Sequence, residues 1–314
     1  MNRFLFILLL SSFCFSQTSI DNAEAFIAKK EFIKAQDEMT LFLSSNPDDL
    51  KAIELLGDAY GHQKKWDEAI EQYQILKQKR PQNANYYYKY GGALGMKALS
   101  ISKLKALGII GDVKDSFHKA AQLDPNHIDA RWALVELYVS LPGIVGGSFS
   151  KALSYAEQLE QLSKVDGYLA KGYVYEYDDE PELAEKYYRL AIKVGGSLTC
   201  YEKLTNFYEG QKQPEKAIGN LEEAKDKHQR NAMHYQIGKV CADYNIQLDK
   251  GEGMLKVYLS NHSAKDGVPK EWAYYRLAQI YKHKNNKAEA LIWINKAISG
   301  LPDIDVFQEF KGGI

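Results

Sequence analysis

A pattern of apolar and small residues recurs every 34 residues along most of this 314-residue chain. Pro47 and Pro81 are 34 residues apart, and between them apolar side chains recur every three or four positions in two stretches. Each stretch predicts an amphipathic helix, and the two together predict a helix hairpin. A repeat of this length cannot bury its apolar face alone, so neighbouring repeats must stack. The chain is therefore expected to form one long helical array rather than two unrelated domains.

Two copies of the repeat are complete, with every spacing kept. Their residues are Ile53, Leu56, Gly57, Tyr60, Ala69, Tyr73 and Leu76 in the first copy, and Tyr274, Leu277, Ala278, Tyr281, Ala290, Ile294 and Ala297 in the second. The pattern resembles the tetratricopeptide repeat, whose Trp, Gly, Ala and Phe positions correspond to Ile53, Gly57, Ala69 and Tyr73. With weaker copies, the resemblance implies an all-α fold, an α-solenoid (superhelix) of about eight hairpins over residues 17–304.

The two ends of the chain fall outside the repeats. Arg3, the apolar stretch from Phe4 to Leu10 and the small residues before Gln17 are typical of a secretory signal over residues 1–16. The apolar stretch is shorter than the ~20 residues of a membrane helix, so we expect cleavage near Ser16 and a periplasmic or secreted chain. A lipid anchor at Cys14 is disfavoured because a bulky phenylalanine precedes it. No later segment is long and apolar enough to span a membrane, and residues 305–314 remain as a C-terminal tail.

Two adjacent repeats carry inserts between their helices, at residues 95–112 and 139–150. The first contains apolar residues that suggest a prolonged amphipathic helix, and the second contains the sequence L-P-G-I-V-G-G. This pair of inserts resembles a group of exported bacterial tetratricopeptide proteins with no assigned chemistry.

Both inserts lie in the turn of a hairpin, so we expect them to touch, with Leu104, Leu107 and Ile110 buried against Leu141, Ile144 or Val145. Gly146 and Gly147 are expected to adopt positive φ. The residues predicted to form this insert surface are Leu107, Ile110, Ile144 and Val145.

The first helices of stacked hairpins line the concave side of a solenoid, which repeat proteins use to hold peptides or partner helices. Side chains that follow the Trp and Gly positions should face this groove. The candidate binding residues chosen from them are Glu54, Asp58, Tyr88, Trp132, Glu136, Tyr173, Tyr235 and Tyr275. Alternatively, the rings pack on neighbouring helices and the charges are merely solvated. The sequence argues against a clamp for a peptide carboxylate, because the residue after the Trp position of the repeat that contains Asn206 is Glu202, which would repel the ligand.

Other kinds of site find little support in the sequence. The net charge of −1 argues against nucleic acid as a partner. The seven histidines include no pair at helical i, i+4 spacing, and no catalytic or metal-binding motif is present. We therefore expect no cofactor and no metal. Cys200 and Cys241 are expected to stay unpaired, because they lie at levels ~12 Å apart along their helices.

These observations favour a non-enzymatic scaffold or adaptor that holds an extended protein segment or partner helix in its concave groove. The partner's identity is not encoded in any motif. An alternative from another class is a cell-envelope assembly component that docks through the insert surface, residues 95–112 with 139–150. An enzyme of unknown class is the third interpretation.

Overall fold

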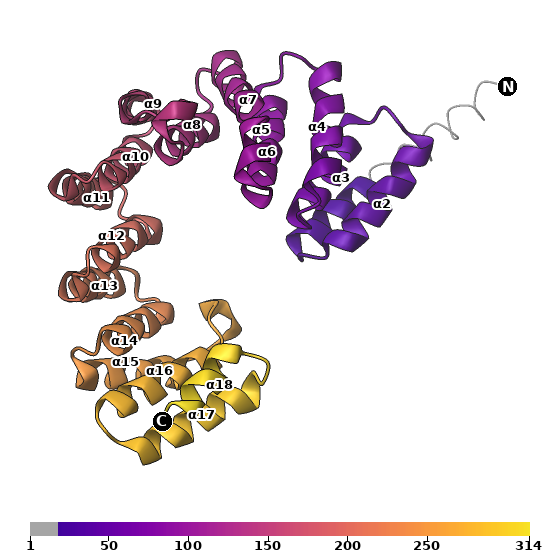
Figure 1. The fold of residues 1–314 in the computed structure, drawn as a ribbon. Helices are drawn as coiled ribbons and strands as arrows, with labels where there is room; N and C mark the ends of the chain where they lie inside the picture. Colours follow the sequence, from indigo (N-terminus) through magenta and orange to yellow (C-terminus); the bar gives the residue numbers. More distant parts are fainter. Residues whose placement is uncertain (1–17) are drawn as a thin grey trace. The chain divides into compact units, whose positions relative to one another are not determined.

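The computed structural model of the protein describes residues 18–314, and within them the regular structure consists of α-helices and short 3-10 turns. The predicted signal at residues 1–16 lies outside the described residues. Consecutive helices pack as antiparallel pairs (Figure 1), which confirms the all-α solenoid fold. The chain divides at Ser163 and Lys164 into two compact units, called unit 1 and unit 2 below. No helix of the described residues has both the length and the apolar character needed to cross a bilayer.

Unit 1 contains four hairpins. The first pairs a helix at residues 18–28 with α2, and the others pair α3 with α4, α5 with α7 and α8 with α9. The bounds are α2 (Phe32–Ser45), α3 (Leu50–His62), α4 (Trp66–Lys79), α5 (Ala84–Ser100), α6 (Lys103–Leu107), α7 (Ile110–Leu123), α8 (Ile128–Ser140), η1 (Gly143–Val145) and α9 (Phe149–Leu162).

Unit 2 also contains four hairpins, which pair α10 with α11, α12 with α13, α14 with α15 and α16 with α17. The bounds are α10 (Lys164–Tyr177), α11 (Pro181–Val194), α12 (Leu198–Gly210), α13 (Pro214–His228), α14 (Asn231–Tyr244), α15 (Leu248–Ser260), η2 (Ala264–Asp266), α16 (Lys270–His283), α17 (Lys287–Gly300) and α18 (Asp305–Gly312). The residues expected to be a C-terminal tail thus form α18. Its Phe307 is fully buried among residues of α16 and α17, so this helix covers the end of the last hairpin.

Small residues at the Gly and Ala positions let the two helices of each hairpin approach closely. A Cβ added to Gly57 would lie 2.7 Å from the Tyr73 ring, and one added to Gly172 would lie 2.6 Å from the Tyr188 ring. Ala184 is completely buried in the same way. Because there is no room for a larger side chain, these positions select for size, and the repeat pattern reports packing rather than function.

The two inserts depart from the expectation that they bury each other. The first helix of its hairpin does continue, to Ser100, but it breaks at Ile101, and α6 follows as a separate short helix. The Leu104 side chain remains 81% exposed and that of Ile144 95% exposed, so the predicted burial of these two residues is wrong. Leu107 is also exposed, whereas Ile110 and Val145 are half-buried.

The second insert packs through its backbone rather than through apolar side chains. A Cβ on Gly146 would lie 3.1 Å from the Lys114 Nζ of α7, and Gly146 has φ 97° as predicted. The prediction of positive φ is wrong for Gly147. Glycine is needed at this position for a steric reason. A Cβ there would lie 1.7 Å from the Leu141 carbonyl oxygen, so only glycine permits this close approach.

Cys200 and Cys241 are buried free thiols, as the register of the repeats predicted. Burial raises the pKa of the Cys241 thiol to about 11, which keeps it protonated and weakly nucleophilic near neutral pH. Both side chains therefore act as small core residues.

Candidate functional site on the first helices

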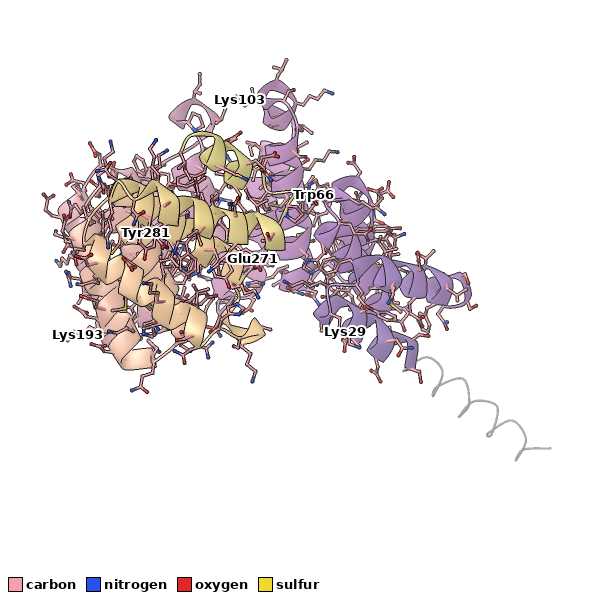
Figure 2. The ribbon with its side chains drawn as sticks, turned by 90° about the horizontal axis from the view of Figure 1, so that it is seen from below. Lys29, Trp66, Lys103, Lys193, Glu271 and Tyr281 are labelled. Carbon is pink, nitrogen blue, oxygen red and sulfur yellow. The ribbon has the colours of Figure 1, made fainter. Side chains whose placement is uncertain are left out.

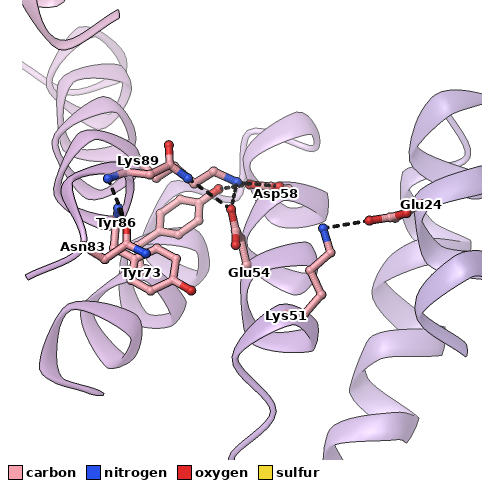
Figure 3. Close-up of polar contacts among 9 residues, drawn as sticks. Glu24, Lys51, Glu54, Asp58, Tyr73, Asn83, Tyr86 and Lys89 are labelled. Atoms are coloured by element: carbon pink, nitrogen blue, oxygen red, sulfur yellow. Dashed lines mark hydrogen bonds and ion pairs between the residues drawn. The ribbon is translucent and has the colours of Figure 1, made fainter. Parts of the chain in front are cut away.

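The acidic residues predicted to begin the groove form an ion-pair cluster in unit 1. Lys89 of α5 lies 2.7 Å from Glu54 Oε1 and 2.7 Å from Asp58 Oδ1, and both carboxylates come from α3. Tyr73 of α4 donates its hydroxyl to Asp58 Oδ1 at 2.7 Å. Figure 3 shows these side chains converging from three helices. We call Glu54, Asp58, Tyr73 and Lys89 the charge cluster.

Further polar contacts surround the charge cluster. Asn85 donates to Glu54 at 3.3 Å, and on the other side of α3 Lys51 pairs with Glu24 at 2.7 Å. Burial and the nearby charge of Asp58 raise the pKa of Tyr73 far above its usual value, so the phenol stays a donor. The polar groups are thus already bonded within the protein, which makes the cluster a brace between α3, α4 and α5.

Tyr88, the first aromatic candidate, is half-buried at the junction of three helices. Its ring lies 6.0 Å from that of Phe117 on α7 and 5.2 Å from that of His127, which caps α8. Burial, followed by the charges of Asp129 and Glu136, raises the pKa of Tyr88. Trp132 is half-buried and Glu136 is exposed, both on α8.

The remaining aromatic candidates, in unit 2, do not form a line of exposed rings. Tyr235 and Tyr275 are 5% and 7% exposed and belong to the hydrophobic core. The Tyr275 ring packs 5.1 Å from that of Phe307, which comes from a helix that the repeat pattern did not predict. The expectation that Tyr235 and Tyr275 face a ligand is therefore corrected, because neighbouring helices cover both rings. Tyr173 is half-buried, with its ring 4.8 Å from that of Tyr177.

A cavity of about 330 Å³ lies between the first helices of two successive hairpins of unit 2, α12 and α14. It is lined by Leu198, Tyr201, Glu202, Thr205, Asn206, Glu209, Leu221, Met233, Gln236 and Lys239. We call it the α12–α14 cavity. Tyr201, Thr205 and Leu221 are buried and form its base, whereas Glu202 and Asn206 are exposed at its mouth.

The base of the α12–α14 cavity is held by hydrogen bonds. Asn220 of α13 donates to Thr205 Oγ1 and to the Tyr201 carbonyl oxygen, each at 2.8 Å. At one side, Lys239 lies 2.9 Å from Glu209 Oε1. These bonds fix the positions of the lining helices before any ligand arrives, which reduces the entropy that binding would cost.

The side chains at the mouth of the cavity, in contrast, are available. Within residues 18–314, Glu202, Asn206 and Gln236 form no side-chain hydrogen bond or ion pair. Asn206 and Gln236 each offer a donor and an acceptor, the pair of groups that an extended peptide backbone needs. The three charged residues of the lining, Glu202, Glu209 and Lys239, leave one negative charge in excess. The cavity therefore suits a neutral or basic segment.

The charge cluster and the α12–α14 cavity occupy equivalent positions of different repeats. Glu202 and Asn206 follow the Trp and Gly positions of α12, as Glu54 and Asp58 do on α3. The repeat pattern predicts that both positions of α12 face the groove, and the carboxylate-clamp pattern is the sequence signal that involves Asn206. No sequence motif indicates the cavity, because it is lined by residues of three helices.

Two substitutions between these repeats explain why one site is filled and the other open. Gln236 lies two residues before the Gly position of α14, where α5 has Lys89. Leu221 lies at the Phe position of α13, where α4 has Tyr73. Leucine is shorter than tyrosine and has no hydroxyl, so it neither fills the space nor reaches the residue that follows the Gly position.

The described residues contain no group of three or more His, Cys, Asp or Glu side chains arranged to hold a metal ion. The α12–α14 cavity contains carboxylate, amide, hydroxyl and ammonium groups. Such a set can bind and orient a polar chain by hydrogen bonds.

Comparison with known proteins identifies the repeats. The tetratricopeptide repeat model matches residues 165–194 and 273–299, which correspond to the hairpins α10 with α11 and α16 with α17. A tetratricopeptide repeat protein from Parabacteroides merdae is similar in structure, with a TM-score of 0.52 and 14% identity over 95% of this chain and 97% of that one. A thermophilic tetratricopeptide repeat protein from Thermus thermophilus gives a TM-score of 0.51 and 15% identity, over 62% of this chain and 97% of that one. At these identities the likeness concerns the fold alone. No curated protein sequence matches the chain significantly.

Proposed function

Because this chain is built from tetratricopeptide repeats, we propose that it is a non-enzymatic interaction scaffold that holds an extended peptide on its first helices. The α12–α14 cavity is the observation that carries this proposal. Its volume of about 330 Å³ lies at the lower end of ligand pockets, about 300–1,000 Å³, and suits one or two side chains of a longer segment.

The chemistry of the cavity indicates how such a segment would bind. Asn206 and Gln236 would bond its backbone, whereas Leu198 and Met233 would contact an apolar side chain. Glu202, exposed and unpaired within the described residues, would favour a lysine or arginine on the segment. We therefore propose a basic or neutral linear peptide as the partner.

Selection from a displayed library of random linear peptides tests this proposal. Peptides recovered on the full chain should be enriched in Lys and Arg, and Asn206→Ala with Gln236→Ala should weaken their binding about tenfold or more, through two lost hydrogen bonds. The matched control is Gln74→Ala with Gln161→Ala, two exposed glutamines on the second helices α4 and α9. Equal binding by the test and control variants would place the peptide elsewhere.

A second candidate function is docking to the cell envelope through the insert surface. It is supported by the exposure of Leu107 and Ile144, which contact little of the protein's own core. This candidate also includes export of the chain with cleavage near Ser16, for which N-terminal sequencing of the protein released by the cell is the test. In cell fractionation, Leu107→Ser with Ile144→Ser should move the protein from the envelope fraction to the soluble fraction. An unchanged distribution would argue against docking at these residues.

A further inference from the structure

The two inserts of unit 1 present large apolar side chains to solvent. Leu99 is 82% exposed on the last turn of α5, and Leu104 and Leu107 are exposed on α6. Met96 and Ile144 are exposed as well. We call Met96, Leu99, Leu104, Leu107 and Ile144 the apolar edge. Exposed apolar residues that cluster in this way mark interaction sites, whereas isolated ones need no explanation.

The two inserts are neighbours in unit 1. The turn η1 follows α8, and a Cβ on Gly146, at the end of this turn, would lie 3.1 Å from Lys114 Nζ. Lys114 belongs to the first turns of α7, directly after α6 and its two exposed leucines. Figure 2 shows Lys103, the first residue of α6, at an outer margin of unit 1. The exposed side chains of the apolar edge are therefore open to a partner.

Positive charge accompanies these apolar residues. Residues 82–111 contain no Asp or Glu, although the whole chain has 41 of them. Lys103 and Lys105 flank Leu104, are exposed and form no ion pair within the described residues. Lys114 also lies beside the second insert, where Asp112 and Asp115 flank it on α7. The edge thus combines leucines with lysines whose aliphatic stems can lie along an apolar layer while their ammonium groups reach outward.

We propose that the apolar edge binds the surface of a bilayer that contains anionic lipids, with its leucines in the headgroup and acyl boundary and its lysines at the phosphates. This inference rests on the docking role proposed for the insert surface and assigns its partner. The composition favours lipid over a protein partner. Within residues 82–111 every charged side chain is a lysine, and this single sign of charge complements the phosphates of anionic lipids.

The expected strength follows from the same residues. Each lysine near an anionic surface strengthens binding about fivefold, so Lys103 and Lys105 together contribute about 25-fold. This contribution should decrease as salt screens the charges. A short edge of a few leucines gives reversible attachment rather than permanent anchoring.

Vesicle sedimentation with the full chain tests the proposal. Wild-type protein should bind vesicles of phosphatidylcholine mixed with phosphatidylglycerol and bind pure phosphatidylcholine far more weakly. Lys103→Gln with Lys105→Gln should weaken binding about 25-fold, and Leu104→Ser with Ile144→Ser about tenfold or more.

The matched controls are Lys29→Gln with Lys203→Gln and Ile33→Ser with Leu41→Ser, all exposed residues outside the edge. All variants should keep the wild-type melting temperature, because their side chains are solvent-exposed. The apolar stretch at residues 4–15 is the same in every variant, so it cannot produce the differences.

A local probe identifies which residues enter the bilayer. The fluorescence of Leu104→Trp should shift to shorter wavelength when anionic vesicles are added, whereas that of Leu41→Trp should not. Similar shifts at both positions, or none at Leu104→Trp, would overturn the proposal. So would equal vesicle binding by the edge variants and their controls.

A different partner would give a different pattern. If Leu104→Ser with Ile144→Ser abolishes envelope association in cells while purified wild-type protein ignores anionic vesicles, the lipid assignment fails and docking to an envelope protein remains. If the same variant instead abolishes concentration-dependent dimerisation without lipid, the edge is a contact between copies of this chain. Either result overturns the lipid proposal.

Discussion

The charge cluster of unit 1 and the α12–α14 cavity of unit 2 involve the same positions of the repeat, but the side chains at these positions are bonded to one another in unit 1 and leave an open cavity in unit 2. In unit 1, Lys89 of α5 forms ion pairs with both carboxylates of α3, and Tyr73 of α4 donates a hydrogen bond to one of them. These bonds hold the three helices together. In unit 2, Gln236 and Leu221 stand at the equivalent positions, and the side chains that follow the Trp and Gly positions stay unbonded. The lesson is that a groove position becomes a brace or a binding site according to what the neighbouring helices supply.

The largest effect is expected from removing the shared cation of the charge cluster. Lys89→Ala would leave Glu54 and Asp58 facing each other in a partly buried site, and we expect the free energy of unfolding to fall by about 2 kcal/mol. Urea unfolding followed by circular dichroism measures it. Gln236→Ala, the same position in unit 2, should change stability by less than about 0.5 kcal/mol. Similar decreases in the free energy of unfolding for both variants would show that the charge cluster does not stabilise unit 1 more than Gln236 stabilises unit 2.

The next effect concerns the phenol of the charge cluster. Tyr73→Phe removes a hydrogen bond to a carboxylate and should cost about 1.5 kcal/mol. A double-mutant cycle with Asp58→Asn should show that the two residues are coupled, whereas a coupling near zero would mean that Tyr73 acts only by filling space.

The raised pKa of Tyr73 also predicts how this contribution changes with pH. The phenol ionises at about pH 10 when unfolded, and its pKa in the folded state is higher because burial and Asp58 oppose the phenolate. The stabilisation is therefore fully present below about pH 10 and is lost as the pH rises above it. The difference in stability between wild type and Tyr73→Phe should narrow in alkaline solution, and a constant difference would contradict this assignment.

Transplanting the brace into unit 2 should close the α12–α14 cavity. Asn206→Asp, Gln236→Lys and Leu221→Tyr recreate the residues of the charge cluster, since Glu202 already matches Glu54, and Thr205→Gly makes room for the new ring as Gly57 does for Tyr73. We expect these four changes to fill the cavity and to abolish the peptide binding proposed for it. The reciprocal triple change, Asp58→Asn, Lys89→Gln and Tyr73→Leu, is the matched variant and should destabilise unit 1. Retained peptide binding in the transplanted variant would show that the cavity is not the binding site.

The smallest effect comes from an ion-pair cluster on another face of unit 2. Glu252 of α15 accepts from Lys256 and Lys284, each at 2.6 Å, and from the Tyr281 hydroxyl at 2.7 Å. Burial opposes ionisation, but these donors outweigh it and lower the pKa of Glu252 to about 2.

Acid unfolding measures this contribution. Because the folded-state pKa is depressed, the stabilisation is present above about pH 4.5 and is lost as the pH falls towards 2. It should amount to about 0.5–1 kcal/mol, since Lys256 is half exposed. Glu252→Gln should be less stable than wild type at neutral pH and approach it in acid. An unchanged gap at low pH would mean that Glu252 is not the titrating group.

The repeat pattern predicted most of the fold because packing imposes it. Gly57 and Gly172 had to be small, since a ring of the paired helix lies where their Cβ would be. The free state of Cys200 and Cys241 followed from the register alone. The pattern did not predict α18, because Phe307 lies outside the repeats and its burial depends on the surface that α16 and α17 leave uncovered.

The sequence by itself determined the helix hairpins and their approximate number, since both depend on local periodicity. Only the tertiary structure decided which side chains of the first helices are covered by neighbouring helices and which stay exposed. Whether Tyr235 is covered, whether Lys89 reaches Asp58, and whether Leu104 meets Ile144 depend on side chains brought together from helices about one repeat apart. Helical periodicity fixes the direction in which a side chain leaves its own helix, but the partner that it meets is fixed by the packing of the next hairpin.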